Sequence, residues 1–107
     1  MGRVIFESII SSTLSPAGRL SVGGCDLREL VEEYGSPLYV FDEDDFRETA
    51  REYQREFKNH WPDVSVLYAA KAYLSRPLAT IVAKEGMGMD VVSYGELAVA
   101  RAAGFPA

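Results

Sequence analysis

The chain has few of the residues that characterise disulfide-rich, metal-binding or membrane proteins. It has one cysteine, Cys25, and one histidine, His60, so an internal disulfide is excluded and no set of soft metal ligands stands at ligand spacing. The apolar run in MGRVIFESIISS is broken at Glu7, well short of the roughly 18 apolar residues that a spanning helix needs. We therefore expect a cytosolic protein without a membrane anchor and without a metal.

Basic residues are also in the minority. The 107 residues include 16 acidic and 11 basic side chains, which gives a formal net charge of −5, and no basic run is present. This balance argues against nucleic acid or an anionic membrane surface as a partner. With 48% hydrophobic residues, a chain of this length can form one domain with a modest core.

Turn and capping signals organise the first third of the chain. Residues 3–24 mix short apolar stretches with turn residues, and SPAG at 15–18 predicts a turn between two strands. Asp26 and Glu29 have the spacing of a capping box, and the apolar residues that follow recur at helical spacing. The sequence therefore predicts a strand, a turn, a strand and then a helix that stops at Gly35.

The remaining sequence alternates between strand and helix patterns. Strands are predicted at 38–41, 64–70 and 87–92, and a helical pattern follows each of them. The run at 64–70 is apolar except for Ser65, which is typical of a strand buried on both faces. Strands that alternate with helices at this spacing predict parallel pairing and an α/β fold. An eight-stranded barrel takes about 250 residues, so the chain contains at most its opening βα units.

Two motifs that suggest chemistry are incomplete. Gly86 and Gly88 begin a dinucleotide-binding pattern, but the pair follows a helix, and Val91 occupies the position of the third glycine. The stretch VVSYG resembles a nucleophile elbow except that Val91 again replaces a required glycine. Ser93 is better explained as a helix cap.

Lys71 is the strongest candidate for a chemical role. It follows the buried strand in the sequence YAAKA, and catalytic groups of parallel barrels lie at that end of the strands. An amine among small apolar neighbours can lose solvation and attack a carbonyl as free base, although most lysines at strand ends are simply solvated. Asp90 ends the next strand and can lie close to Lys71, with a helix-capping or solvated aspartate as the alternative.

Three segments carry a resemblance to a known family: LRELVEEYGSPLYVFDEDDFR at 27–47, VLYAAKA at 66–72 and MDVVSYGELAVARAAGFP at 89–106. They resemble the N-terminal quarter of the diaminopimelate decarboxylases, which belong to the fold-type III pyridoxal 5′-phosphate (PLP) family. By this resemblance Lys71 matches the lysine that binds PLP covalently. Asp90 matches the acid near that lysine, and Glu96 matches an acid that can receive the lysine when substrate displaces it.

The resemblance also implies an architecture and a reaction. Residues 1–30 would contribute strands to a β domain, and residues 31–107 would form the first three βα units of a (β/α)8 TIM-type barrel. The family acts as a homodimer and decarboxylates meso-2,6-diaminopimelate to L-lysine and CO2. Alternatives within the resemblance are decarboxylases of arginine, ornithine or carboxynorspermidine, and a noncatalytic decarboxylase-like regulator that binds a partner.

The chain departs from the family pattern in two ways. Tyr73 stands where many relatives carry asparagine, although some diaminopimelate enzymes have an aromatic residue there. Nothing in the chain matches the glycine-rich phosphate loop, the EPGR segment, the catalytic cysteine or the C-terminal tyrosine of the family. We therefore expect a truncated chain that, by itself, neither binds PLP tightly nor decarboxylates.

Overall fold

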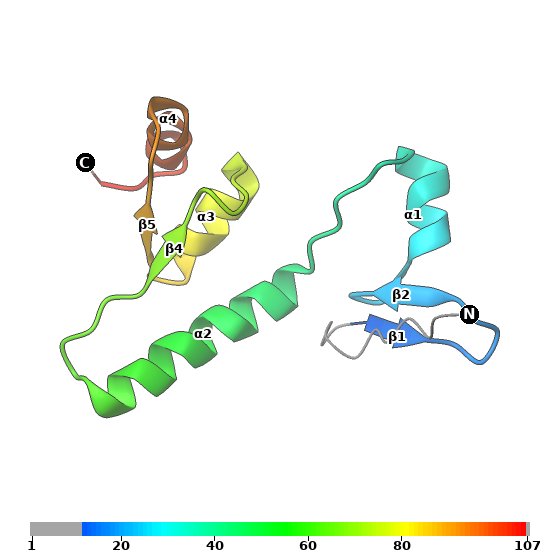
Figure 1. Cartoon of the computed structure of the whole chain (residues 1–107), viewed down its shortest axis with the longest axis horizontal. Coiled ribbons are helices and arrows are strands. Elements are labelled where there is room, and N and C mark those ends of the chain that lie inside the picture. The colour runs from blue at the N-terminus through cyan, green and yellow to red at the C-terminus, as the bar shows by residue number, and fades with distance from the viewer. Residues whose placement is uncertain (1–11, 107) are drawn as a thin grey trace. The chain divides into compact units, whose positions relative to one another are not determined.

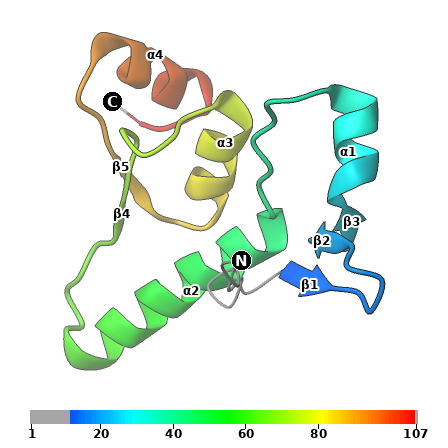
Figure 2. The same ribbon diagram turned by 45° about the vertical axis from the view of Figure 1, so that its right-hand side comes forward.

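The computed structural model describes residues 12–106, whose helices and strands are labelled in Figure 1, except for β3, which is labelled in Figure 2. The chain divides into two compact units, residues 1–46 and residues 47–107. The start of the first predicted strand, at 3–11, lies outside the described residues. No helix formed by the described residues is both long enough and apolar enough to cross a membrane.

The first unit contains a small antiparallel sheet. Its strands are β1 (Ser12–Leu14), β2 (Leu20–Val22) and β3 (Cys25–Asp26), in that order across the sheet. The SPAG segment forms the turn between β1 and β2, because the N–H of Gly18 donates to the carbonyl of Ser15 at 2.9 Å. The predicted strand, turn and strand are confirmed for the residues that the structure describes.

The third strand, β3, was not predicted from the sequence. Gly23 and Gly24 connect β2 to β3, and both have positive φ angles, 57° and 78°. A two-residue hairpin loop with positive φ at both positions follows the twist of the flanking strands, and glycine adopts these angles without a steric cost. The Gly-Gly pair is therefore a hairpin signal that the apolar pattern alone does not reveal.

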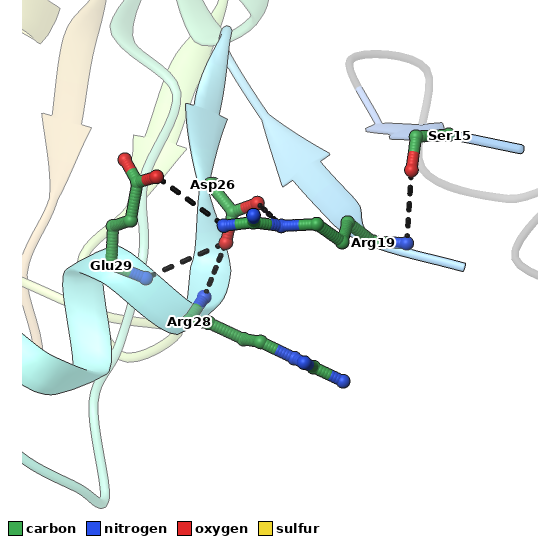
Figure 3. Close-up of polar contacts among 5 residues, drawn as sticks. All are labelled: Ser15, Arg19, Asp26, Arg28 and Glu29. Carbon is green, nitrogen blue, oxygen red and sulfur yellow. Dashed lines mark hydrogen bonds and ion pairs between the residues drawn. The ribbon is translucent and has the colours of Figure 1, made fainter. Parts of the chain in front are cut away.

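Helix α1 (Leu27–Tyr34) begins at its cap, Asp26, as predicted. Figure 3 shows that the Asp26 carboxylate accepts from the N–H of Arg28 at 2.9 Å and from Nε of Arg19 at 2.6 Å. The hydrogen bond from Arg19 lowers the pKa of Asp26 below its usual value. The Glu29 carboxylate lies 3.3 Å from Nη2 of Arg19, so Arg19 joins the β1–β2 hairpin to the first turn of α1.

The predicted strand at 38–41 is wrong. Residues 38–42 form neither helix nor strand, and Tyr39 is 83% exposed. A parallel strand exists only when a neighbouring strand accepts and donates its backbone hydrogen bonds. An apolar run of four residues supplies no such partner by itself.

The second unit contains a parallel βαβ arrangement. Its elements are α2 (Glu43–His60, which starts in the last residues of the first unit), β4 (Leu67–Ala69), α3 (Arg76–Lys84), β5 (Gly88–Asp90) and α4 (Tyr94–Ala102). Strands β4 and β5 are parallel neighbours, and α3 packs against β5 and α4 (Figure 2). Both strands are shorter than the predicted 64–70 and 87–92, because a strand ends where its hydrogen-bonded neighbour ends.

The buried apolar side chains of the described residues all belong to the second unit. They are Ala50, Ala70, Leu78, Ala79, Val82 and Ala100. Helix α3 contributes half of this core through Leu78, Ala79 and Val82. In contrast, Leu67 of β4 is 59% exposed, so the prediction of a strand buried on both faces is wrong.

Candidate active site

Serine caps fix the starts of the two helices that follow β4 and β5. Oγ of Ser75 accepts from the N–H of Leu78 at 3.3 Å, and Oγ of Ser93 accepts from the N–H of Glu96 at 3.2 Å. The prediction that Ser93 is a helix cap is confirmed. Each strand therefore passes through a short connection into a capped helix, and the carboxyl ends of β4 and β5 lie at one edge of the sheet.

Lys71 lies in a tight turn directly after β4. The N–H of Ala70 donates to the carbonyl of Asp90 at 3.0 Å, which extends the pairing of the strands by one bond. The N–H of Ala72 then donates to the carbonyl of Ala69 at 3.1 Å, so Lys71 is the third residue of a four-residue turn. Ala70 is buried at 2% exposure, whereas Lys71 is exposed. Within residues 12–106 the Lys71 side chain is exposed, and the loss of solvation at its amine stays a prediction.

Asp90 ends β5 on the neighbouring strand. In the parallel register it stands opposite Ala69, two residues before Lys71. The sheet thus brings the backbones of these two predicted site residues together. Within residues 12–106 no ion pair joins the Lys71 ammonium to the Asp90 carboxylate, and both residues are exposed. The role of Asp90 stays a prediction.

Glu96 lies in the first turn of α4, close in sequence to the end of β5. Its Oε2 atom accepts from the N–H of Val92 at 2.7 Å, while its own N–H donates to Ser93. These two bonds hold the start of α4 in the manner of a capping box. The structure thus shows a helix-capping contact for Glu96, and its predicted role in receiving Lys71 stays a prediction.

Tyr68 was not among the predicted site residues, although it precedes Lys71 by only three positions. Its hydroxyl donates to the carbonyl of Tyr73 at 2.7 Å, across the turn that contains Lys71. Burial raises the pKa of Tyr68 above its usual value. The only signal in the sequence is an aromatic residue with a polar tip inside an otherwise small and apolar motif.

The site offers an accessible primary amine and few other reactive groups. An amine of this kind can condense with the aldehyde of a cofactor such as PLP, so the residues present fit that group at the point of attachment. The structure describes no cluster of three or more histidine, cysteine, aspartate or glutamate side chains able to hold a metal ion in residues 12–106. The geometry defines an α/β segment that carries an exposed lysine at the carboxyl edge of its parallel strands.

Comparison with known proteins identifies the family. The pyridoxal-dependent decarboxylase family, through its pyridoxal binding domain, matches residues 44–107. This match covers more than half of the chain and includes Lys71, Asp90 and Glu96. The chain belongs to this family of pyridoxal-dependent decarboxylases. The prediction of PLP as the cofactor is confirmed at the level of the family.

Curated relatives and a solved structure support the same assignment. The chain is 44% identical over 89 residues to the diaminopimelate decarboxylase of Synechocystis sp., covering 82% of this chain and 19% of that protein. It is 44% identical over 90 residues to the diaminopimelate decarboxylase of Bacillus subtilis, covering 84% and 20% of the two chains.

The diaminopimelate decarboxylase of M. jannaschii, solved in complex with L-lysine, superimposes with a TM-score of 0.73 at 30% identity, covering 89% of this chain and 23% of that one. The α/β class predicted from the sequence is therefore confirmed. The chain spans about a fifth of the length of the curated relatives it matches.

Proposed function

We propose that this chain is the lysine-bearing part of a PLP-dependent diaminopimelate decarboxylase, which converts meso-2,6-diaminopimelate to L-lysine and CO2. The observation that carries the proposal is the exposed Lys71 at the carboxyl end of β4, inside a region that matches the pyridoxal binding domain. The relatives named diaminopimelate decarboxylase support the substrate, because the identity to them extends beyond the lysine motif to most of the chain.

The chain contributes three residues to the proposed site. Lys71 supplies the amine that holds the cofactor covalently, and its position in a turn outside the core lets the amine reach a bound molecule. Asp90, at the end of the adjacent strand, supplies negative charge on the same edge of the sheet. Glu96 can hold a proton or the displaced lysine amine near the start of α4. When bound, PLP supplies the ring that delocalises the electron pair left behind as CO2 departs.

The larger architecture belongs to the same proposal. The β4–α3–β5–α4 segment has the order and the parallel pairing of consecutive units in a (β/α)8 barrel. In this arrangement Lys71 and Asp90 stand at the catalytic face of the barrel, and residues 1–30 contribute strands to a separate β domain. We further propose a cytoplasmic homodimer, as the family resemblance implies.

Two other functions are compatible with a lysine at this position. One is decarboxylation of arginine, ornithine or carboxynorspermidine, and the other is a noncatalytic regulator that binds a partner. The exposed amine of Lys71 favours an enzyme, because a binding protein has no need of an amine that forms a covalent bond with a cofactor. The relatives favour diaminopimelate over the other substrates.

Covalent trapping and turnover test this proposal in the full-length protein that contains the chain. The protein is incubated with PLP, reduced with borohydride and digested, and the labelled peptide is identified by mass spectrometry. We expect the label at Lys71 and CO2 release from meso-2,6-diaminopimelate, with little release from arginine, ornithine or carboxynorspermidine. Lys71→Ala is expected to lower turnover by at least about a thousandfold, because the attachment amine is lost.

Lys84→Ala is the matched control, since Lys84 is an exposed lysine of α3 and is expected to leave turnover unchanged. A label on another lysine, or full turnover of Lys71→Ala, would remove the enzyme assignment. Release of CO2 from ornithine or arginine in preference to diaminopimelate would support PLP as the cofactor and contradict diaminopimelate as the substrate.

A further inference from the structure

Two hydrogen bonds close the turn that contains Lys71, and one of them joins residues that are farther apart in the sequence than the other. The inner bond joins the N–H of Ala72 to the carbonyl of Ala69 at 3.1 Å. The outer bond joins the hydroxyl of Tyr68 to the carbonyl of Tyr73 at 2.7 Å, so it brackets the whole turn from the strand to the residue that follows it. A distance of 2.7 Å is the usual length of a well-formed O–H···O bond.

One end of this outer bond is anchored in the sheet. Tyr68 is the middle residue of β4 and stands opposite Met89 of β5 in the parallel register. Its side chain is half-buried, and its hydroxyl is the donor of the outer bond. The outer bond thus connects a fixed strand to the chain segment that leaves the turn.

The Lys71 side chain has no comparable support of its own. Within residues 12–106 it takes part in no hydrogen bond or ion pair. The place from which its amine reaches a cofactor is therefore set by the backbone of the turn. A long side chain on a loose turn loses more conformational freedom when it becomes fixed, so a preformed turn favours the covalent attachment.

We propose that Tyr68 is a positioning residue for Lys71, whose hydroxyl holds the turn in the form that directs the lysine amine toward the cofactor. This assignment rests on the proposed function and adds a residue to it. Tyr68 acts through the backbone carbonyl of Tyr73, to which its hydroxyl donates. The alternative is that Tyr68 only adds to the general stability of the unit.

The test compares Tyr68→Phe with Tyr53→Phe in the full-length protein. Both changes remove one hydroxyl and keep the ring, and Tyr53 lies on α2, where its ring stacks on Phe57. Each protein receives PLP below saturation, and borohydride traps the bound cofactor at timed intervals before peptide mapping. We expect Tyr68→Phe to slow labelling of Lys71 by about fivefold or more, the size expected from one lost hydrogen bond.

Internal references come from the other lysines. Lys58 and Lys84 are exposed, and their labelling is expected to be the same in both variants and in the unmodified protein. Amide hydrogen exchange gives a readout that does not depend on the cofactor. In Tyr68→Phe the Ala72 amide is expected to exchange faster by a similar factor, while the Ala70 amide, bonded to Asp90, stays protected.

Each other result overturns the assignment. Unchanged labelling of Lys71 in Tyr68→Phe shows that the outer bond does not guide the amine. Loss of amide protection throughout β4, or an equal decrease in Tyr53→Phe, shows that the hydroxyl is merely structural. These results leave the proposed function intact when the unmodified protein is labelled at Lys71. An unmodified protein that takes no label at Lys71 contradicts the proposed function itself, and the role of Tyr68 with it.

Discussion

Glu85 shows how one side chain can connect two helices in the second unit. It is the C-cap that follows Lys84, the last residue of α3, and its side chain is only 6% exposed. Its carboxylate accepts from Nε of Arg51 at 2.7 Å and from Nη1 of Arg47 at 2.5 Å, both on α2. Its backbone carbonyl accepts from Nε2 of Gln54, which lies on the same helix. Three side chains of α2 thus converge on the end of α3.

The two arginines make this contact dependent on pH. Hydrogen bonds from Arg51 and then Arg47 lower the pKa of Glu85 below its usual value. Because the folded state favours the ionised carboxylate, the contribution to stability is present above the usual pKa of a glutamate, about 4.3. It is lost as the pH falls through the lowered pKa of the folded state.

We therefore expect Glu85→Gln to lower the melting temperature of the full-length protein at about pH 6 and to have a smaller effect at about pH 3, because below the usual pKa of a glutamate the unfolded chain holds a proton that folding must release. Thermal unfolding at the two pH values measures this difference. Glu52→Gln is the control, since Glu52 is an exposed acidic residue of α2, and it should leave the melting temperature nearly unchanged at both. If Glu85→Gln lowers the melting temperature by the same amount at both pH values, the result contradicts a role for the ionised carboxylate.

At the scale of elements, α3 and α4 end in the same way. After α3, the N–H of Gly86 donates to the carbonyl of Ala83, and the N–H of Met87 donates to the carbonyl of Val82. Gly104 and Phe105 repeat this pair of bonds after α4. This is the Schellman arrangement, in which the residue after the helix takes a left-handed conformation. The φ angle of Gly86 is 73°, which explains why glycine is needed there.

A matched pair of glycine substitutions tests this reason. Gly86→Ala is expected to lower the free energy of unfolding by about 1 kcal/mol or more, because an L side chain is strained at this φ. Gly88→Ala adds the same methyl group to β5, where it would meet Cδ2 of Leu67. That atom is the end of a flexible and largely exposed side chain, so we expect a cost below about 0.5 kcal/mol. Urea unfolding of the full-length protein measures the loss of free energy of unfolding in each variant. Equal losses would show that the positive φ angle of Gly86 is not the cause of its effect.

At the scale of the whole molecule, the buried core is small for the number of apolar side chains. Four of the six buried apolar residues are alanines, and Val82 is the largest side chain that is fully buried among the described residues. Many large apolar side chains stay exposed, and three aromatic ones follow each other along α2 and just beyond its end: Tyr53 at 57%, Phe57 at 42% and Trp61 at 61%. Exposed apolar area of this kind promotes association.

We expect the 107-residue chain, when produced by itself, to bind the dye ANS and to associate in a concentration-dependent way. Analytical ultracentrifugation over a range of concentrations and dye fluorescence measure the two effects. Trp61→Ser is expected to reduce both, because it removes one of the exposed rings. A monomer that does not bind the dye and unfolds in one sharp transition would contradict the expectation that the exposed apolar side chains cause association.

The local features of this protein were predictable from its sequence. Serine caps, the SPAG turn and the glycines after the helices act within a few residues, so the sequence around each one is enough to place it. The position of Lys71 after a strand followed from the same local patterns. The sequence motifs also identified the family, because they preserve the order and spacing of several segments.

The rest depended on partners that lie far away in the sequence. Only the folded chain shows that 38–41 forms no strand and that β4 and β5 are short, because a strand requires a hydrogen-bonded neighbour. The contact between Arg47 and Glu85 joins residues that are 38 positions apart, and no local pattern predicts it.

The surroundings of Lys71 were decided in the same way. The sequence placed Lys71 among alanines after a strand, and the folded chain shows that it lies in a turn closed by Ala69, Ala72 and Tyr68. Sequence alone thus singled out the candidate lysine and determined where helices begin and end, since those signals are local. Tertiary structure decided which strands pair and how the lysine is held, because hydrogen bonds and burial depend on what the chain brings together.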